Sequence, residues 1–103
     1  MPVYLINNMT IHDRGEYDAY LRAFMAVFRK FDGQVLVAQE APSPIEGTWP
    51  YDRTILLSFH TREEALRWYE SPEYQAIVVY RFNGTTSNVV MLDGLPSATP
   101  GRT

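Results

Sequence analysis

The chain has 103 residues, a formal net charge of −3 and no cysteine. This length suits a single domain, and a hydrophobic content of 46% is typical of a globular protein. Without cysteine, disulfides, thiolate catalysis and zinc sites built on sulfur are excluded. Lysine and arginine are scattered along the chain, which argues against nucleic-acid binding, because that function requires clustered basic residues.

No signal peptide is expected at the N-terminus. The N-terminus enters a strand pattern at Val3 without the basic and apolar regions of a signal peptide. No apolar run approaches the roughly 20 residues of a membrane-spanning helix. We therefore expect a cytoplasmic protein that contacts no membrane. One domain is expected over residues 1–94, followed by a loose tail over 95–103 that contains two prolines and a glycine.

The first half of the chain predicts a strand, a helix and a second strand. The first strand is expected from Val3 to Ile11, and Asp13 with Glu16 forms a capping-box pattern at the start of a helix. Gly33 predicts the helix end, and Gln34 to Gln39 the next strand. One face of this helix is apolar at the spacing i, i+3, i+4, i+7, formed by Tyr17, Tyr20, Leu21, Phe24, Phe28 and Phe31.

A long connection follows, from Ala41 to Asp52, and it is rich in proline. Loops of about a dozen residues are uncommon in compact domains and are usually functional or disordered. Ile45 and Trp49 within it favour a loop that packs against another part of the protein. A third strand is predicted from Arg53 to His60.

The second helical region contains a predicted break. Thr61 resembles an N-cap, and the helix that follows carries Trp68. Pro72 suits only the first turn of a helix, and Ser71 before it is a good N-cap, so one helix is expected to end and another to begin at this point. Asn83-Gly84 predicts a turn, and the fourth strand is expected from Thr86 to Leu92.

The element order β-α-β-β-α-β predicts an α+β, ferredoxin-like fold, with a four-stranded antiparallel sheet and two helices on one face. The strands are apolar in both registers, since Tyr4 and Ile6 alternate with Val3 and Leu5. Two helices cover one face only, and an uncovered apolar face would exceed what monomers expose. We therefore expect a two-fold homodimer joined through the sheet faces, burying about 1,600 Å² in total.

Several segments together resemble a known family. They are residues 16–20 (Glu-Tyr-Asp-Ala-Tyr), 46–50 (Glu-Gly-Thr-Trp-Pro), Arg53, Phe59, and 68–75 (Trp-Tyr-Glu-Ser-Pro-Glu-Tyr-Gln). With them the chain is similar to the domain of unknown function (DUF) 1330 family, in the dimeric α/β-barrel superfamily. The resemblance spans about Val3 to Gly94 and implies a ferredoxin-like protomer and a dimer, but no function.

Relatives by fold in that superfamily include cofactor-independent quinol monooxygenases, muconolactone isomerase-like enzymes, polyketide-modifying enzymes and haem enzymes. They place the substrate between the helices and the sheet. The chain departs from the family pattern at Pro42 and Pro44, which are expected to reshape one rim of such a pocket.

A pocket for an aromatic or carboxylated metabolite is predicted between the helices and the sheet, roofed by the loop over residues 41–52. Ligand sites are mostly apolar with a few polar groups that fix orientation. Arg53 is expected to anchor an anionic or carbonyl oxygen; the alternative is a structural pair with Glu46. The predicted ligand-binding residues are Tyr17, Tyr20, Trp49, Arg53, Trp68 and Tyr74.

Candidate catalytic residues come from the resemblance alone. Trp68 and Tyr74 are similar to a Trp and a Tyr of some cofactor-free monooxygenases, where an Asn is also used and Asn7 or Asn8 would supply it. The alternative is that Trp68 and Tyr74 only pack the helices together.

No metal or cofactor is expected, because His12, His60 and Asp13 match no recognised metal spacing. Arg81 is a second candidate to bind a carboxylate or enolate. The alternative, which the sequence favours, is a solvated helix end where a cation suits the helix dipole. Three functions stay open: a small-molecule pocket, a cofactor-independent monooxygenase or isomerase, and a non-catalytic structural or regulatory dimer.

Overall fold

The computed structural model describes residues 2–96. The expected loose tail lies outside the described residues from position 97 onward. None of the helices within 2–96 combines the length and apolar character needed to cross a bilayer. The elements are, in chain order, β1 (Val3–Ile11), α1 (Arg14–Phe28), β2 (Gln34–Glu40), β3 (Arg53–Phe59), α2 (Arg62–Tyr69), α3 (Pro72–Gly84) and β4 (Thr85–Asp93).

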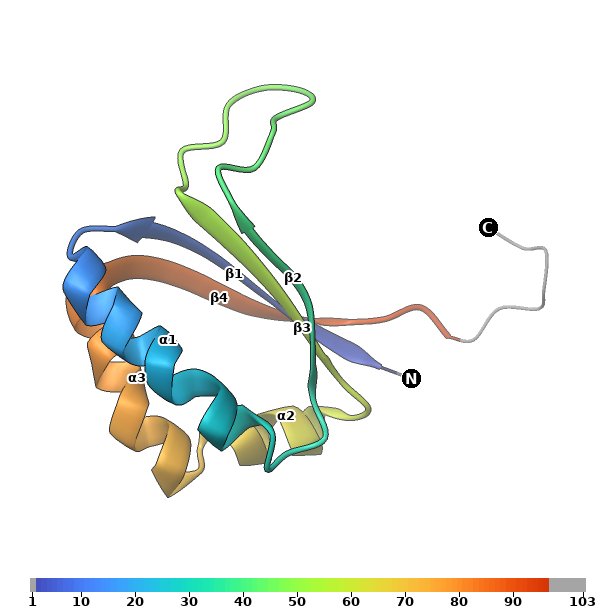
Figure 1. Cartoon of the computed structure of the whole chain (residues 1–103). Coiled ribbons are helices and arrows are strands. Elements are labelled where there is room, and N and C mark those ends of the chain that lie inside the picture. Colours follow the sequence, from blue (N-terminus) through green and yellow to red (C-terminus); the bar gives the residue numbers. More distant parts are fainter. Residues whose placement is uncertain (1, 97–103) are drawn as a thin grey trace.

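The four strands form one antiparallel sheet in the order β2-β3-β1-β4. All three helices lie on one side of this sheet (Figure 1). This arrangement confirms the predicted α+β, ferredoxin-like fold, with the second helical region divided in two. We call the sheet face toward the helices the inner face and the opposite one the outer face.

The start of α1 agrees with its capping pattern, but its end does not. The Asp13 carboxylate accepts a hydrogen bond from the backbone N–H of Glu16 at 3.1 Å. The helix ends at Phe28, not at Gly33, because the chain tightens into turns in which Phe31 N–H donates to the Phe28 carbonyl at 3.0 Å. Gly33 allows a close approach instead, since a Cβ there would come within 2.6 Å of the Phe28 and Phe59 rings.

The break before Pro72 is confirmed. The Ser71 hydroxyl accepts from the backbone N–H of Tyr74 at 3.1 Å and donates to the carbonyl of Trp68 at 2.8 Å. One side chain therefore satisfies the end of α2 and the start of α3 together. The turn predicted at Asn83-Gly84 is wrong, because α3 continues through Gly84 and passes directly into β4.

The inner face of the sheet carries the core. Strand pairing sets Val3 opposite Phe59 and Leu5 opposite Leu57, and all four are buried under the helices. Because side chains alternate along a strand, the intervening residues Tyr4 and Ile6 point to the outer face, opposite Leu92 and Val90 of β4. Leu92 and Val90 are 48% and 51% exposed, so in one protomer this apolar outer face stays uncovered.

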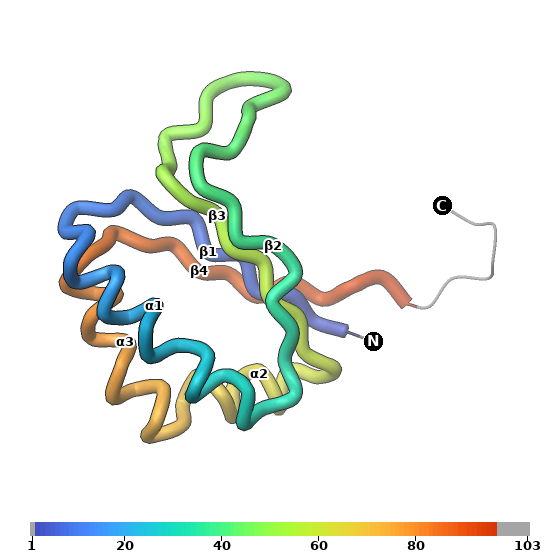
Figure 2. The backbone as a smooth tube through the Cα atoms, viewed as in Figure 1, coloured from blue at the N-terminus to red at the C-terminus, as the bar shows by residue number. Residues whose placement is uncertain are grey.

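The connection between β2 and β3 projects beyond the sheet (Figure 2). Its base is fixed, because Ala41 N–H donates to the Asp52 carbonyl at 2.9 Å and Asp52 N–H donates to the Met9 carbonyl at 2.8 Å. The Asp52 carboxylate also accepts from Ile11 N–H at 2.8 Å. The loop is thus held at the end of the sheet and directed away from the helices.

Candidate functional site

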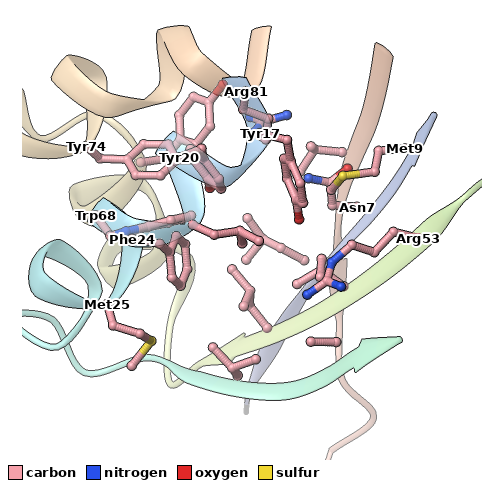
Figure 3. A pocket seen from close by; sticks show the side chains of 18 residues that line it. Asn7, Met9, Tyr17, Tyr20, Phe24, Met25, Arg53, Trp68, Tyr74 and Arg81 are labelled. Carbon is pink, nitrogen blue, oxygen red and sulfur yellow. The ribbon is translucent and has the colours of Figure 1, made fainter. Parts of the chain in front are cut away.

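A cavity of about 210 Å³ lies between the helices and the inner face of the sheet (Figure 3). A cavity of roughly 150 Å³ admits benzene, so this one accommodates a substituted aromatic ring. Its mouth lies between α1 and β2, where the lining residues Leu21, Met25 and Val35 are 37%, 46% and 40% exposed.

The break between α2 and α3 builds an aromatic wall on one side of the cavity. It turns the chain so that the rings of Trp68 and Tyr74 meet at 4.2 Å between centroids. Phe24 packs edge-on against Trp68 at 6.2 Å, and Tyr20 lies edge-on to Tyr74 at the same distance. In Figure 3 these four side chains gather on one side, whereas Asn7 and Arg53 lie on the other.

Tyr20 and Tyr74 share a hydrogen bond between their hydroxyls at 2.7 Å. Burial raises the pKa of Tyr20 well above its ordinary value, and the bond to Tyr74 adds to that rise. Burial also raises the pKa of Tyr74, although the nearby Arg81 guanidinium opposes the rise. Both phenols therefore stay protonated near neutral pH and act as hydrogen-bond donors, not as bases.

Arg53 lines the cavity beside Tyr17, with its guanidinium carbon 5.8 Å from the ring centre. Burial raises the pKa of Tyr17, and Arg53 opposes this rise. The suggested Arg53–Glu46 pair is wrong. Strand pairing instead sets Glu40 opposite Arg53, and Arg53 Nη1 contacts Glu40 Oε1 at 3.2 Å. The same oxygen contacts Arg14 of α1 at 3.0 Å, which links the helix to β2.

Arg81 is buried, with 3% of its surface exposed, so the expectation of a solvated helix end is wrong. It lines the cavity from the same face of α3 as Tyr74 and Val78, which are also buried. Its guanidinium carbon lies 5.9 Å from the ring centre of Tyr20 and 5.3 Å from that of Phe82. The spacing Tyr74, Val78, Arg81 already places the arginine on the buried face of the helix, and this signal could have identified it.

Polar atoms without a partner gather at this cavity. Among the described residues, the buried side-chain atoms that lack a hydrogen bond are Asn7 Oδ1, Arg53 Nε, Trp68 Nε1 and Arg81 Nε, and all four residues line the cavity. No Asp, Glu or His within residues 2–96 lines it. Asn7 faces the cavity from β1, whereas Asn8 points to the outer face and accepts from Thr54 at 3.0 Å.

Trp49 lies outside the cavity, and so does the rest of its loop. The predicted site residues other than Trp49 all line the cavity. The Trp49 indole N–H donates to the Thr54 hydroxyl at 3.2 Å, and Thr54 belongs to the outer face. The expected roof formed by residues 41–52 is therefore wrong, because the fixed base of the loop directs it away from the helices.

Neither of the two histidines lines the cavity. His12 Nε2 forms a hydrogen bond with the Thr86 hydroxyl, and His60 is exposed. Within the part of the chain that the structure describes, no group of three or more His, Cys, Asp or Glu side chains is arranged to hold a metal ion.

Comparison with solved structures shows the fold of the protomer. A protein of unknown function from Rhodopseudomonas palustris is 17% identical to this chain and superposes with a TM-score of 0.78. The match covers 93% of this chain and 84% of that chain. A cofactor-independent oxygenase from Streptomyces nogalater is 11% identical, with a TM-score of 0.68 and coverage of 93% and 95%. A dimeric protein of unknown function and ferredoxin-like fold from Bacteroides fragilis is 13% identical, with a TM-score of 0.64 and coverage of 90% and 96%.

No curated protein matches the chain. The family model described as domain of unknown function (DUF1330) matches residues 2–95, which is nearly the whole sequence. The chain therefore belongs to the DUF1330 family.

Proposed function

We propose that each protomer binds a small, mainly aromatic molecule in the cavity between the helices and the sheet. The unpartnered polar atoms of Asn7, Arg53, Trp68 and Arg81 carry this proposal, because all four residues line one mainly apolar cavity. A buried polar group without a partner costs about 1–3 kcal/mol. A ligand that bonds to these atoms would recover that free energy.

The chemistry of the free atoms describes the ligand. Trp68 Nε1, Arg53 Nε and Arg81 Nε are all N–H donors, so the ligand should present oxygen acceptors. Asn7 Oδ1 is an acceptor and suits a hydroxyl of the ligand. The Trp68 and Tyr74 rings offer a wall on which an aromatic ring can pack.

A matched pair of variants tests the pocket. If Arg53 donates to the ligand, Arg53→Ala should weaken binding by about 1.5–3 kcal/mol, the range for a hydrogen bond to a charged group. Arg62→Ala is the control, because Arg62 is exposed and pairs with Asp93 away from the cavity. Native mass spectrometry of the purified protein would identify a retained ligand, and calorimetry would measure its affinity.

The result that contradicts a ligand role for Arg53 is equally specific. If Arg53 only braces the strands through Glu40, Arg53→Ala should leave affinity unchanged and lower the melting temperature, and Glu40→Ala should lower it similarly.

A cofactor-independent oxygenase is the second candidate function. The similarity of fold to the oxygenase from Streptomyces nogalater supports it, together with the contact of Trp68 and Tyr74 at the cavity and the free Asn7. The protonated tyrosines and the absence of Asp, Glu and His from the lining within residues 2–96 leave no evident base. A substrate that enters already ionised, and is oxidised by O2, would suit such a site.

Oxygen uptake tests this second candidate. Wild-type protein with an ionisable benzenediol should consume O2 faster than the compound alone, and Trp68→Phe should lower the rate. Equal rates with and without protein across a panel of such compounds would leave the binding function alone.

We also propose that two protomers pair through the outer faces of their sheets. Leu36, Val37, Val90 and Leu92 are between 41% and 51% exposed, and the Bacteroides fragilis protein of similar fold is described as dimeric. Trp49 lies at the end of this face through its bond to Thr54, so we assign it to the dimer contact. Sedimentation that gives only an 11.9 kDa species at micromolar concentration would contradict the dimer.

A further inference from the structure

The two arginines that line the cavity differ in how their charge is balanced. Arg53 has a carboxylate partner, because Glu40 Oε1 lies 3.2 Å from its Nη1. For Arg81, no carboxylate within residues 2–96 lies at ion-pair distance. The deeper of the two is therefore the one without a carboxylate partner, since Arg81 is buried whereas Arg53 is only partly buried.

The neighbours of Arg81 balance its charge only in part. The ring faces of Tyr20 and Phe82 attract the guanidinium, at 5.9 and 5.3 Å from its central carbon. Its Nε nevertheless has no hydrogen-bond partner. Buried charges in proteins are normally paired with an opposite charge, and a buried cation without one is costly.

We propose that the cavity binds its ligand as an anion, with the negatively charged oxygen at Arg81. This inference rests on the proposed function of the cavity and names the chemical class of its ligand. The ligand supplies the negative charge that the described lining residues lack. In Figure 3 the Arg81 guanidinium lies between the Tyr20–Tyr74 pair and Tyr17, so the anion would sit at the polar side of the aromatic wall.

The hydroxyl pair of Tyr20 and Tyr74 completes this subsite. In their shared bond at 2.7 Å one hydroxyl donates and the other accepts. The accepting hydroxyl keeps its own proton, which remains available for an oxygen of the ligand. The anionic oxygen would then be held by the Arg81 guanidinium and by one phenolic O–H, which are a charged and a neutral donor.

Cavity size and lining restrict the ligand further. The volume of about 210 Å³ and the aromatic wall suit one ring with a short substituent. An aromatic carboxylate and an ionised phenol or enol both present such an oxygen, and they share the chemistry on which the proposal depends. Two pairs of probes separate them.

The first pair is benzoate and benzamide, which have similar shape and differ in charge. The second is 4-nitrophenol, whose absorbance reports its ionisation, and its neutral methyl ether 4-nitroanisole. Affinities are measured by NMR titration of wild-type protein, Arg81→Gln and the control Arg62→Gln. We expect an anion to bind wild-type protein and Arg62→Gln roughly 10- to 100-fold more tightly than its neutral partner, and Arg81→Gln to lose this preference.

The two pairs of probes then identify the chemical class of the anion. A preference for benzoate indicates a carboxylate ligand, and a lowered pKa of bound 4-nitrophenol that returns to normal in Arg81→Gln indicates a phenolate or enolate. Circular dichroism verifies the fold of each variant, and Arg81→Met replaces Arg81→Gln if the latter does not fold.

Two results would overturn the inference. If the neutral probes bind as tightly as the anions and Arg81→Gln changes neither, the anion subsite is wrong and the aromatic pocket stands. If none of the four probes binds at millimolar concentration, the proposed binding function fails and the anion subsite fails with it.

Discussion

Replacing Arg81 by methionine should make the empty protein at least as stable as the wild type. Arg81 is 3% exposed and has no acidic partner within the described residues. Replacing buried ionic groups by apolar side chains of similar volume is neutral or stabilising by about 1–4 kcal/mol. The lost contacts with the Tyr20 and Phe82 rings offset about 0.5–2 kcal/mol of this gain. Taking the middle of each range, we expect a net gain of about 1 kcal/mol.

Urea unfolding at a fixed protein concentration measures this difference, because the proposed dimer would make the apparent stability depend on concentration. Arg62→Met is the matched control, since the exposed Arg62–Asp93 pair at 3.0 Å is worth at most about 1 kcal/mol. Adding benzoate should reverse the order and stabilise the wild type more than Arg81→Met. A loss of about 2 kcal/mol or more in Arg81→Met without ligand would show that Arg81 is satisfied by its surroundings, and would refute the reasoning.

Three further predictions concern other parts of the molecule. Val90→Asp, on the exposed outer face, should convert a dimer to an 11.9 kDa monomer in sedimentation, whereas Asp18→Asn on α1 should not. Glu40→Gln should tighten benzoate binding, because it frees Arg53, and should lower the melting temperature slightly, because it releases Arg14. Calorimetry measures both effects. Unchanged binding would place Arg53 outside the ligand contacts. Burial raises the folded-state pKa values of Tyr20 and Tyr74, so the unfolded chain loses these protons at a lower pH than the folded protein does. The free energy of unfolding should therefore decline as the pH rises above 10.0. Tyr20→Phe should reduce that decline.

The fold could be predicted from the sequence because its signals are local. The Asp13 cap with Glu16 and the Ser71-Pro72 pair fix helix starts through bonds within four residues, and the structure forms them. Alternation along β1 separates Val3 and Leu5 from Tyr4 and Ile6, and the sheet register keeps that separation. Errors in the elements occur at ends such as Phe28, where turns follow the helix without a break in the apolar pattern.

The site was only partly predictable because partner choice depends on register and on loop direction. Glu40 and Glu46 are both near Arg53 in the sequence, and only the pairing of β2 with β3 places Glu40 opposite it. Trp49 could pack on either side of the sheet, and the bonds that hold Ala41 and Asp52 at the loop base decide the outer side. No pattern in the sequence reports such bonds.

The position of the unpartnered atoms argues that the cavity is a functional feature of the fold. Defects of packing would leave such residues scattered through the core, whereas here all four line one cavity. They come from different elements: Asn7 from β1, Arg53 from β3, Trp68 from α2 and Arg81 from α3. Apolar residues at these positions would remove the cost of each unsatisfied group, about 1–3 kcal/mol. Natural proteins tolerate such a loss of stability mainly at functional sites and compensate for it elsewhere in the structure. The same arrangement predicts that a bound anion stabilises the protein through the N–H donors of Arg53, Trp68 and Arg81, so that its effect on unfolding exceeds that expected from contact with the aromatic wall alone. Only a ligand that also carries a hydroxyl can donate to Asn7 Oδ1.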